Sequence, residues 1–115
     1  MKQGEIWLIN LDPTVGAEIK KTRPAIIVND NALGKLPLKI IVPITDWKDR
    51  YGTAPWMTRL EPDKENGLTK VSTADSFQVR SVSQERFIKQ IGTVSETIMD
   101  EIRIGLAKVL SIDSE

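Results

Sequence analysis

The chain has 115 residues, of which 40% are apolar and 28% charged, a composition that favours one folded domain over residues 1–115 rather than disorder. Its sixteen basic and sixteen acidic residues cancel, so the net charge neither favours nor excludes a nucleic-acid partner. The absence of cysteine excludes disulfides and thiolate metal sites, and the absence of histidine removes the commonest general base. We therefore expect no metal and no cofactor.

The sequence carries no sign of export or membrane insertion. The first five residues lack the apolar core of a signal peptide, and no run approaches the roughly 20 apolar residues of a membrane span. A chain without cysteine also suits a reducing compartment. We expect a cytoplasmic protein that does not enter a membrane.

Short apolar runs alternate with turn-forming residues along the first half of the chain. Residues 6–9, 25–28 and 40–44 are rich in β-branched side chains, have strand length and are bounded by proline, asparagine, aspartate or glycine. Residues 56–60 alternate more weakly between apolar and polar positions. These four segments predict β-strands.

The second half begins with a longer alternating stretch. Residues 71–82 alternate polar and apolar side chains, which predicts an extended segment with Gln78 and Arg80 together on its polar face. Residues 83–86 have the composition of a single helical turn, and residues 87–93 that of a further strand. The pattern therefore predicts more antiparallel strands after residue 70.

One amphipathic helix is predicted at the end of the chain. Apolar residues recur there at helical period, at Ile98, Ile102, Leu106, Val109 and Leu110. Ser95 is placed to cap the helix, while Thr93 and Glu96 offer a competing capping box. Short antiparallel strands followed by a single helix predict a mainly β fold, a small half-open barrel with a C-terminal helix.

The segment 11–24 concentrates charged side chains between two predicted strands. Within six positions it carries Glu18, Lys20, Lys21 and Arg23, and Gly16 and two prolines shape its backbone. Pro24 opens the next strand and excludes helical backbone at Arg23, which leaves the guanidinium at a strand entrance. The composition by itself fits a solvated connector as well as a binding loop.

A second segment, residues 46–56, combines aromatic and basic side chains. The aromatic residues are Trp47, Tyr51 and Trp56, and the basic ones are Lys48 and Arg50. Such mixtures stack and neutralise unpaired nucleotides in single-stranded nucleic-acid binding. Packing of Trp56 in the core or in a dimer face is the alternative.

Ordered motifs along nearly the whole chain resemble those of the MazF/PemK (Kid) toxins. They are Gly4-Glu5-Ile6-Trp7, Asp12-Pro13-Thr14-x-Gly16-x-Glu18, Thr22-Arg23-Pro24, Val42-Pro43-Ile44-Thr45, Asp75-x-x-Gln78-Val79-Arg80-Ser81 and Ser95-x-x-Ile98-Met99. The resemblance implies an SH3-like half-open barrel of the MazF, Kid and CcdB type, usually a homodimer. It also implies sequence-specific cleavage of messenger RNA and inhibition by a cognate antitoxin.

The resemblance also implies active-site residues. In the family, the arginine before the proline of the second strand and the threonine after the proline of the third strand are active-site residues, and here these positions are Arg23 and Thr45. Glu18 matches a glutamate that is implicated in some members. The functional histidine of the Kid and PemK branch is Ala17 here, so the expected catalytic set is Arg23, Thr45 and Glu18.

This set can act on RNA without a metal, because the substrate carries its own nucleophile, the 2′-hydroxyl. Arg23 can stabilise the charge that develops on the phosphate, and Thr45 can donate a hydrogen bond to the phosphate or to the leaving oxygen. Glu18 or Asp75 can accept the 2′-proton if the site raises its pKa. Such a reaction leaves a 2′,3′-cyclic phosphate and a 5′-hydroxyl.

Seven further residues are expected to bind the single-stranded RNA. They are Lys20, Lys21, Trp47, Arg50, Asp75, Gln78 and Arg80. Glutamine can pair with a base edge, and arginine or lysine with phosphate. We expect residues 11–23 and 46–56 to form one groove that an extended segment of the antitoxin also occupies.

Two functions of other classes remain open from the sequence. One is a non-enzymatic poison of DNA gyrase, because CcdB toxins share this fold, and the other is a module that binds RNA without cutting it. The presence of Arg23, Thr45 and Gly16-x-Glu18 favours the ribonuclease.

Overall fold

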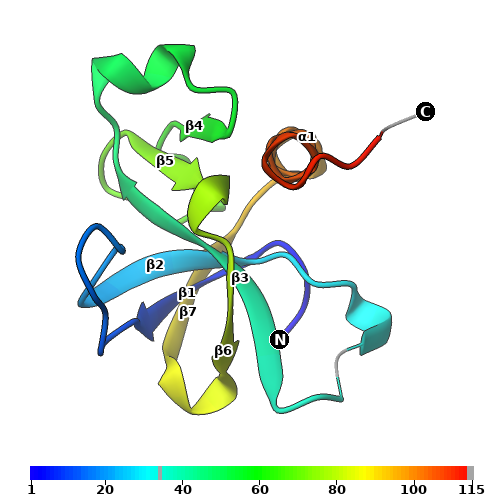
Figure 1. Ribbon diagram of the computed structural model, residues 1–115. Helices are drawn as coiled ribbons and strands as arrows, with labels where there is room; N and C mark the ends of the chain where they lie inside the picture. The colour runs from blue at the N-terminus through cyan, green and yellow to red at the C-terminus, as the bar shows by residue number, and fades with distance from the viewer. Residues whose placement is uncertain (34, 114–115) are drawn as a thin grey trace.

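The computed structural model describes residues 1–33 and 35–113, and within these ranges the chain forms an antiparallel β-structure with one α-helix (Figure 1). The strands are β1 (Glu5–Asn10), β2 (Thr22–Ile27), β3 (Leu38–Asp46), β4 (Met57–Leu60), β5 (Ser72–Asp75), β6 (Arg80–Ser83) and β7 (Phe87–Thr93). The helices are α1 (Glu96–Leu110) and the short 3₁₀ turns η1 (Asn31–Leu33), η2 (Asp49–Thr53), η3 (Ser76–Gln78) and η4 (Gln84–Arg86). The mainly β architecture with a C-terminal helix is confirmed.

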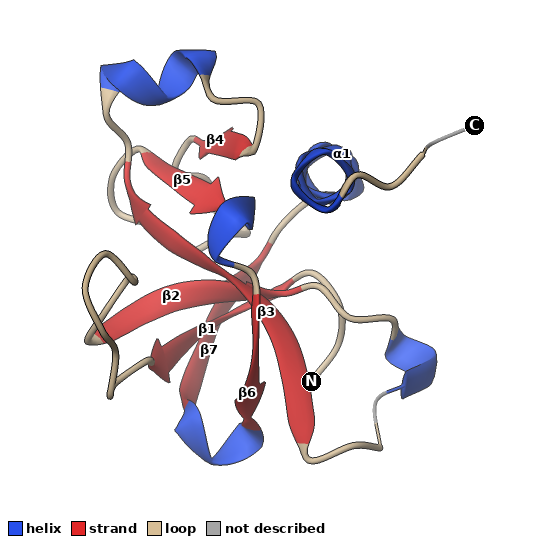
Figure 2. Ribbon diagram, viewed as in Figure 1, coloured by secondary structure: helices blue, strands red, loops and turns tan. Residues whose placement is uncertain are grey.

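The long strand β3 is the centre of the sheet. Its first half pairs with β6 and its second half with β5, while β2 pairs along the middle. The strand order is β4-β5-β3-β2-β1-β7, and no recorded pairing within the described residues joins β4 to β7, so the barrel is half open. In Figure 2, β3 runs from the part of the molecule that holds β6 to the part that holds β4 and β5.

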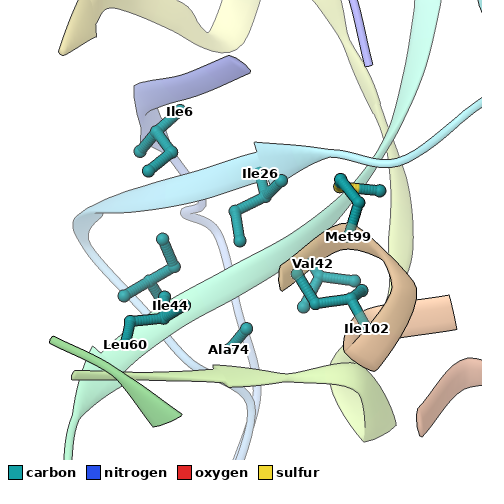
Figure 3. Packing of buried hydrophobic residues seen from close by; sticks show 8 residues of the cluster. All are labelled: Ile6, Ile26, Val42, Ile44, Leu60, Ala74, Met99 and Ile102. Atoms are coloured by element: carbon teal, nitrogen blue, oxygen red, sulfur yellow. The ribbon is translucent and has the colours of Figure 1, made fainter. Parts of the chain in front are cut away.

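The main core lies between the sheet and α1. Ile6, Ile26, Val42 and Ile44 from the central strands meet Leu60 and Ala74, and all have 2% of their surface exposed or less (Figure 3). Met99 and Ile102 from α1 close the cluster. Each large apolar side chain buried in this way contributes about 1.5–3 kcal/mol, so the β-branched runs of the sequence form the strands by filling this core.

The four strands expected in the first half of the chain are confirmed, with small changes in length. The segment 40–44 is the middle of the longer β3, and Ile40 within it remains 41% exposed. The segment 56–60 loses Trp56, since β4 begins at Met57. Propensity located these strands, while pairing partners determined where they end.

The extended segment expected over residues 71–82 is wrong. After β5 the chain makes the turn η3 and resumes as β6, so Gln78 lies in the turn and not beside Arg80 on a strand face. Ser76 is fully buried near Gly105 of α1, and the Asp75 carboxylate accepts the Phe77 N–H at 3.0 Å. Helix packing and this cap break the strand, although the alternating pattern continues through it.

The C-terminal helix begins as the sequence predicted. The Ser95 hydroxyl accepts the Ile98 N–H at 3.2 Å, so Ser95 is the cap, whereas Thr93 ends β7. Of the apolar stripe, Ile102 is fully buried, whereas Leu110 in the last turn is 57% exposed. No helix among the described residues is long and apolar enough to span a membrane.

The connection from β4 to β5 is fixed by a buried asparagine. Asn66 is 4% exposed; its side chain accepts the N–H groups of Asp63 and Leu68 and donates to the carbonyl of Glu61. This loop packs against β7 at Gly92, where an added Cβ would lie 2.4 Å from the Asn66 backbone. The loop is therefore held in one conformation over the end of β7.

Replacing Gly92 with alanine is expected to lower the melting temperature, because the new methyl group would overlap the backbone of the loop. Overpacking of this kind costs typically about 1–3 kcal/mol. Gly52→Ala is the control, since nothing lies within 4 Å of a Cβ at that position. Thermal unfolding followed by circular dichroism measures both variants, and equal melting temperatures would contradict the close contact.

Candidate active site

Strand pairing brings Arg23 and Thr45 together. The pairing of β2 with β3 ends at Ala25 and Pro43, and Arg23 and Thr45 each lie two residues beyond that pair along their own strands. Both side chains are half-buried, and both line a cleft of about 120 Å³. Two residues far apart in the sequence thus share one site at the entrance of β2.

The loop before β2 is folded by its own side chains. The Asp12 carboxylate accepts the Thr14 hydroxyl and the Lys21 N–H, each at 3.1 Å. Glu18 is exposed and accepts the Val15 N–H at 2.6 Å. Lys20 and Lys21 are exposed, and Arg23 Nε approaches the Lys20 carbonyl at 3.4 Å. The charged side chains of the loop are therefore presented to solvent by an ordered backbone.

A second cleft, of about 480 Å³, lies between this loop and the turn η3. Its walls are Ala17, Glu18, Ile19, Pro43, Phe77, Gln78, Val79 and Arg80. Pro43 of β3 lines this cleft, and the next two residues of the strand, Ile44 and Thr45, line the first cleft. Glu18 thus lines a different cleft from Arg23 and Thr45.

Gln78 and Arg80 hold the loop in place as well as lining the second cleft. The Ile19 N–H donates to Gln78 Oε1 at 2.6 Å, and Gln78 Nε2 donates to the Ala17 carbonyl at 3.3 Å. Arg80 Nη1 donates to the Leu11 carbonyl at 3.2 Å. The sequence did not indicate this tether, because its ends are about 60 to 70 residues apart.

Asp75 is buried and lines neither of these two clefts. It has 6% of its surface exposed, and its carboxylate caps η3 through the Phe77 N–H. Burial raises the pKa of the Asp75 carboxyl above its ordinary value of 3.8, while the hydrogen bonds from Phe77 and Gln78 oppose the rise. Asp75 therefore has a structural role as the cap of η3. This role is separate from the RNA binding that the sequence predicted for it.

The aromatic residues of segment 46–56 already contact one another and nearby cations. Trp47 and Tyr51 meet edge to face, with ring centroids 6.1 Å apart. Arg59 lies over Trp47 at 5.1 Å from its centroid, and Arg50 lies over Tyr51 at 5.4 Å. Trp56 packs against Phe77 at 5.6 Å. The segment is an ordered aromatic and basic surface, of which neither Trp47 nor Arg50 lines the two clefts described above.

The structure adds two residues that no sequence motif indicated. Asp46 and Lys70 line the same cleft as Arg23 and Thr45, and Lys70 Nζ lies 3.2 Å from Asp46 Oδ2. Lys70 comes from the β4–β5 loop, whose composition is that of an ordinary polar connection. Within residues 1–33 and 35–113, no group of three or more acidic side chains is placed to hold a metal ion.

Solved structures with the same fold include bacterial toxins. MazF from Deinococcus radiodurans superposes with a TM-score of 0.80 at 23% identity, over 96% of each chain. A mycobacterial endoribonuclease in complex with its cognate antitoxin superposes with a TM-score of 0.78 at 18% identity, over 100% of this chain and 99% of that one. The fold therefore defines the class, a MazF-type toxin barrel.

Sequence comparison identifies the family. The model of the PemK-like, MazF-like toxins of type II toxin–antitoxin systems matches residues 2–110. Endoribonuclease PemK of Escherichia coli is 34% identical over 113 residues, which cover 96% of this chain and 83% of the relative. Endoribonuclease MazF9 of Mycobacterium tuberculosis is 31% identical over 101 residues, 83% of each chain. The chain belongs to the PemK-like, MazF-like toxin family of type II toxin–antitoxin systems.

Asp75→Asn is expected to change how stability depends on pH. The raised pKa means that folded Asp75 keeps its proton to a higher pH than the unfolded chain does, so this residue lowers wild-type stability as pH rises from the ordinary value of 3.8 through the folded pKa. Asparagine retains an oxygen acceptor for Phe77 but has no charge.

Urea unfolding of both proteins between about pH 3 and pH 7 measures this difference. The free energy of unfolding of the asparagine variant should increase relative to wild type as pH rises. A difference that stays constant over the whole range would mean that the pKa of Asp75 is the same in both states.

Proposed function

We propose that this toxin is a sequence-specific, metal-independent endoribonuclease that cuts single-stranded messenger RNA as one half of a toxin–antitoxin pair. The observation that carries the proposal is the shared cleft of Arg23 and Thr45 at the entrance of β2. A guanidinium and a hydroxyl in one small cleft suit a phosphodiester. The endoribonucleases among the relatives support the same reaction.

The reaction is an in-line transfer within the RNA. A carboxylate accepts the 2′-hydroxyl proton, the 2′-oxygen forms a bond to phosphorus, and the bond from phosphorus to the 5′-oxygen breaks. Arg23 stabilises the charge on the non-bridging oxygens. Thr45 donates its proton to the leaving 5′-oxygen, and the proton held by the carboxyl returns through water to Thr45, which restores both groups. The products are a 2′,3′-cyclic phosphate and a 5′-hydroxyl.

Glu18 is the stronger candidate for the general base. Its side chain is exposed on the loop and lines the cleft next to that of Arg23, where an RNA strand crossing both clefts would reach it. Asp75 is buried, and its carboxylate is engaged by the cap of η3. A base must approach the 2′-hydroxyl within hydrogen-bond reach, which an exposed loop side chain can do more readily.

The RNA path is proposed to follow the exposed cations beside these clefts. Lys20 and Lys21 lie on the loop, and Arg50 lies beyond the end of β3. Gln78 and Arg80 line the second cleft and can read a base or bind a phosphate there. Asp75, beneath the same turn, would orient Gln78.

A cognate antitoxin and a second copy of the chain are the proposed protein partners, in the cytoplasm. Solved toxins of this fold include MazF of Deinococcus radiodurans in complex with MazE, at a TM-score of 0.74 and 22% identity. An extended antitoxin segment that carries acidic and apolar side chains would compete with RNA for Lys20, Lys21 and the aromatic surface of segment 46–56. Inhibition then follows from occupation of the RNA path.

Cleavage of a long RNA is expected to continue in excess EDTA and to leave cyclic-phosphate ends. The chain has no histidine or cysteine, and the proposed chemistry uses only an arginine, a threonine and a carboxylate. Gel analysis of the fragments and mass spectrometry of their ends measure both properties. Loss of cleavage in EDTA with recovery on adding zinc or magnesium would contradict the mechanism, and a mobility shift without cleavage would indicate a non-enzymatic binding module.

Arg23→Ala is expected to lower turnover by roughly a hundredfold or more, because it removes a donor that stabilises developing charge. Lys108→Ala, which removes a positive charge from α1, is the control and should cleave like wild type. Thermal unfolding of both variants separates chemistry from folding. A loss of stability in Arg23→Ala as large as that of the core variant Ile102→Ala would assign Arg23 a structural role.

A further inference from the structure

A second cation lies at the cleft of Arg23 and Thr45. The cleft is built from three segments: the start of β2, the end of β3 and residues 68–72, which include Lys70. Lys70 Nζ is 3.2 Å from Asp46 Oδ2, and both side chains are more than half exposed. The ammonium group is therefore beside the proposed phosphate site and open to solvent.

The backbone around Lys70 is fixed on both sides. The Ser72 hydroxyl donates to the Lys70 carbonyl at 2.9 Å, and the Trp47 N–H donates to the Val71 carbonyl at 3.2 Å. On the other side, the buried Asn66 holds the preceding turn. Because the backbone is fixed, only the side chain of Lys70 can still move. Its length limits the amino group to the edge of the cleft.

Folding stability does not account for the ion pair of Lys70 with Asp46. Exposed pairs of this kind contribute little to stability, because solvent screens them and both side chains lose entropy. The carboxylate of Asp46 would by itself repel an RNA phosphate from the cleft, and Lys70 neutralises it. A phosphate entering the cleft can replace Asp46 as the partner of the ammonium group without leaving a buried charge unpaired.

We propose that Lys70 is a second phosphate-binding residue of this active site, acting with Arg23 on the same phosphate, and that Asp46 positions it in the free enzyme. This inference rests on the proposed function. Arg23 supplies a planar pair of donors, while Lys70 supplies a point charge from the loop segment of the same cleft. The two cations together offset the negative charge that builds up as the phosphorane forms.

The test compares Lys70→Met, Lys70→Arg and Asp46→Asn with wild type. Lys64→Met is the matched control, because it removes the same charge from the same loop without touching the cleft. For Lys70→Met we expect kcat/KM for a short RNA with one cleavage site to fall about tenfold or more, as for the loss of a charge-assisted hydrogen bond. Lys70→Arg should retain most activity, and Asp46→Asn should lose less than Lys70→Met.

A binding measurement separates this inference from the proposed function. The probe is the same RNA with 2′-deoxyribose at the cleavage site, titrated at several salt concentrations. Loss of one phosphate contact should reduce the salt slope by about 0.7 in Lys70→Met, with no change in Lys64→Met. Thermal unfolding confirms that the variants fold.

Equal effects of Lys70→Met and Lys64→Met, or none from Lys70→Met, would overturn the role of Lys70. Wild-type protein that binds the RNA probe but cuts no RNA would overturn the proposed function. In that case the salt slope of Lys70→Met still decides whether Lys70 contacts a phosphate.

Discussion

The pairing of β3 with three neighbouring strands is the constraint on which the rest of the structure depends. Its nine residues pair with β6 at one end, β5 at the other and β2 in between. This pairing brings the strands that carry Arg23 and Thr45 together at one cleft, and it places Pro43 at the second cleft. Because a shift by one residue would move every side chain of the strand to the other face, the core and the site depend on the same register.

The loop before β2 depends on side chains from the far end of the chain. Gln78 and Arg80 bind its backbone at Ile19, Ala17 and Leu11, and Arg86 binds the carbonyls of Asn10 and Asp12. The same loop carries the carboxylate proposed as the general base. A change in the turn η3 would therefore alter the position of Glu18 without removing any proposed catalytic group, which couples the chemistry to tertiary packing.

An active site without histidine has no imidazole to act as acid or base. It must rely more on fixed charges that stabilise the developing charge of the reaction. The structure provides these charges at the smaller cleft, which Arg23 and the pair of Lys70 with Asp46 line together with Thr45. The cation–π contacts of Arg50 and Arg59 hold the neighbouring aromatic surface in an ordered arrangement. Electrostatic stabilisation by groups already in position is the main means by which such a site can accelerate phosphoryl transfer.

Local chemistry in the sequence determined most strands, the Ser95 cap and the charged loop, because β-branched runs, capping residues and prolines act over a few residues. Family motifs indicated Arg23 and Thr45. Tertiary structure alone decided the break at η3, which follows from the packing of Ser76 near Gly105, and the tether of Gln78 to the loop. It also decided the place of Lys70 at the cleft, since contacts between distant segments are set by strand register and a buried asparagine, and neither leaves a periodic pattern in the sequence.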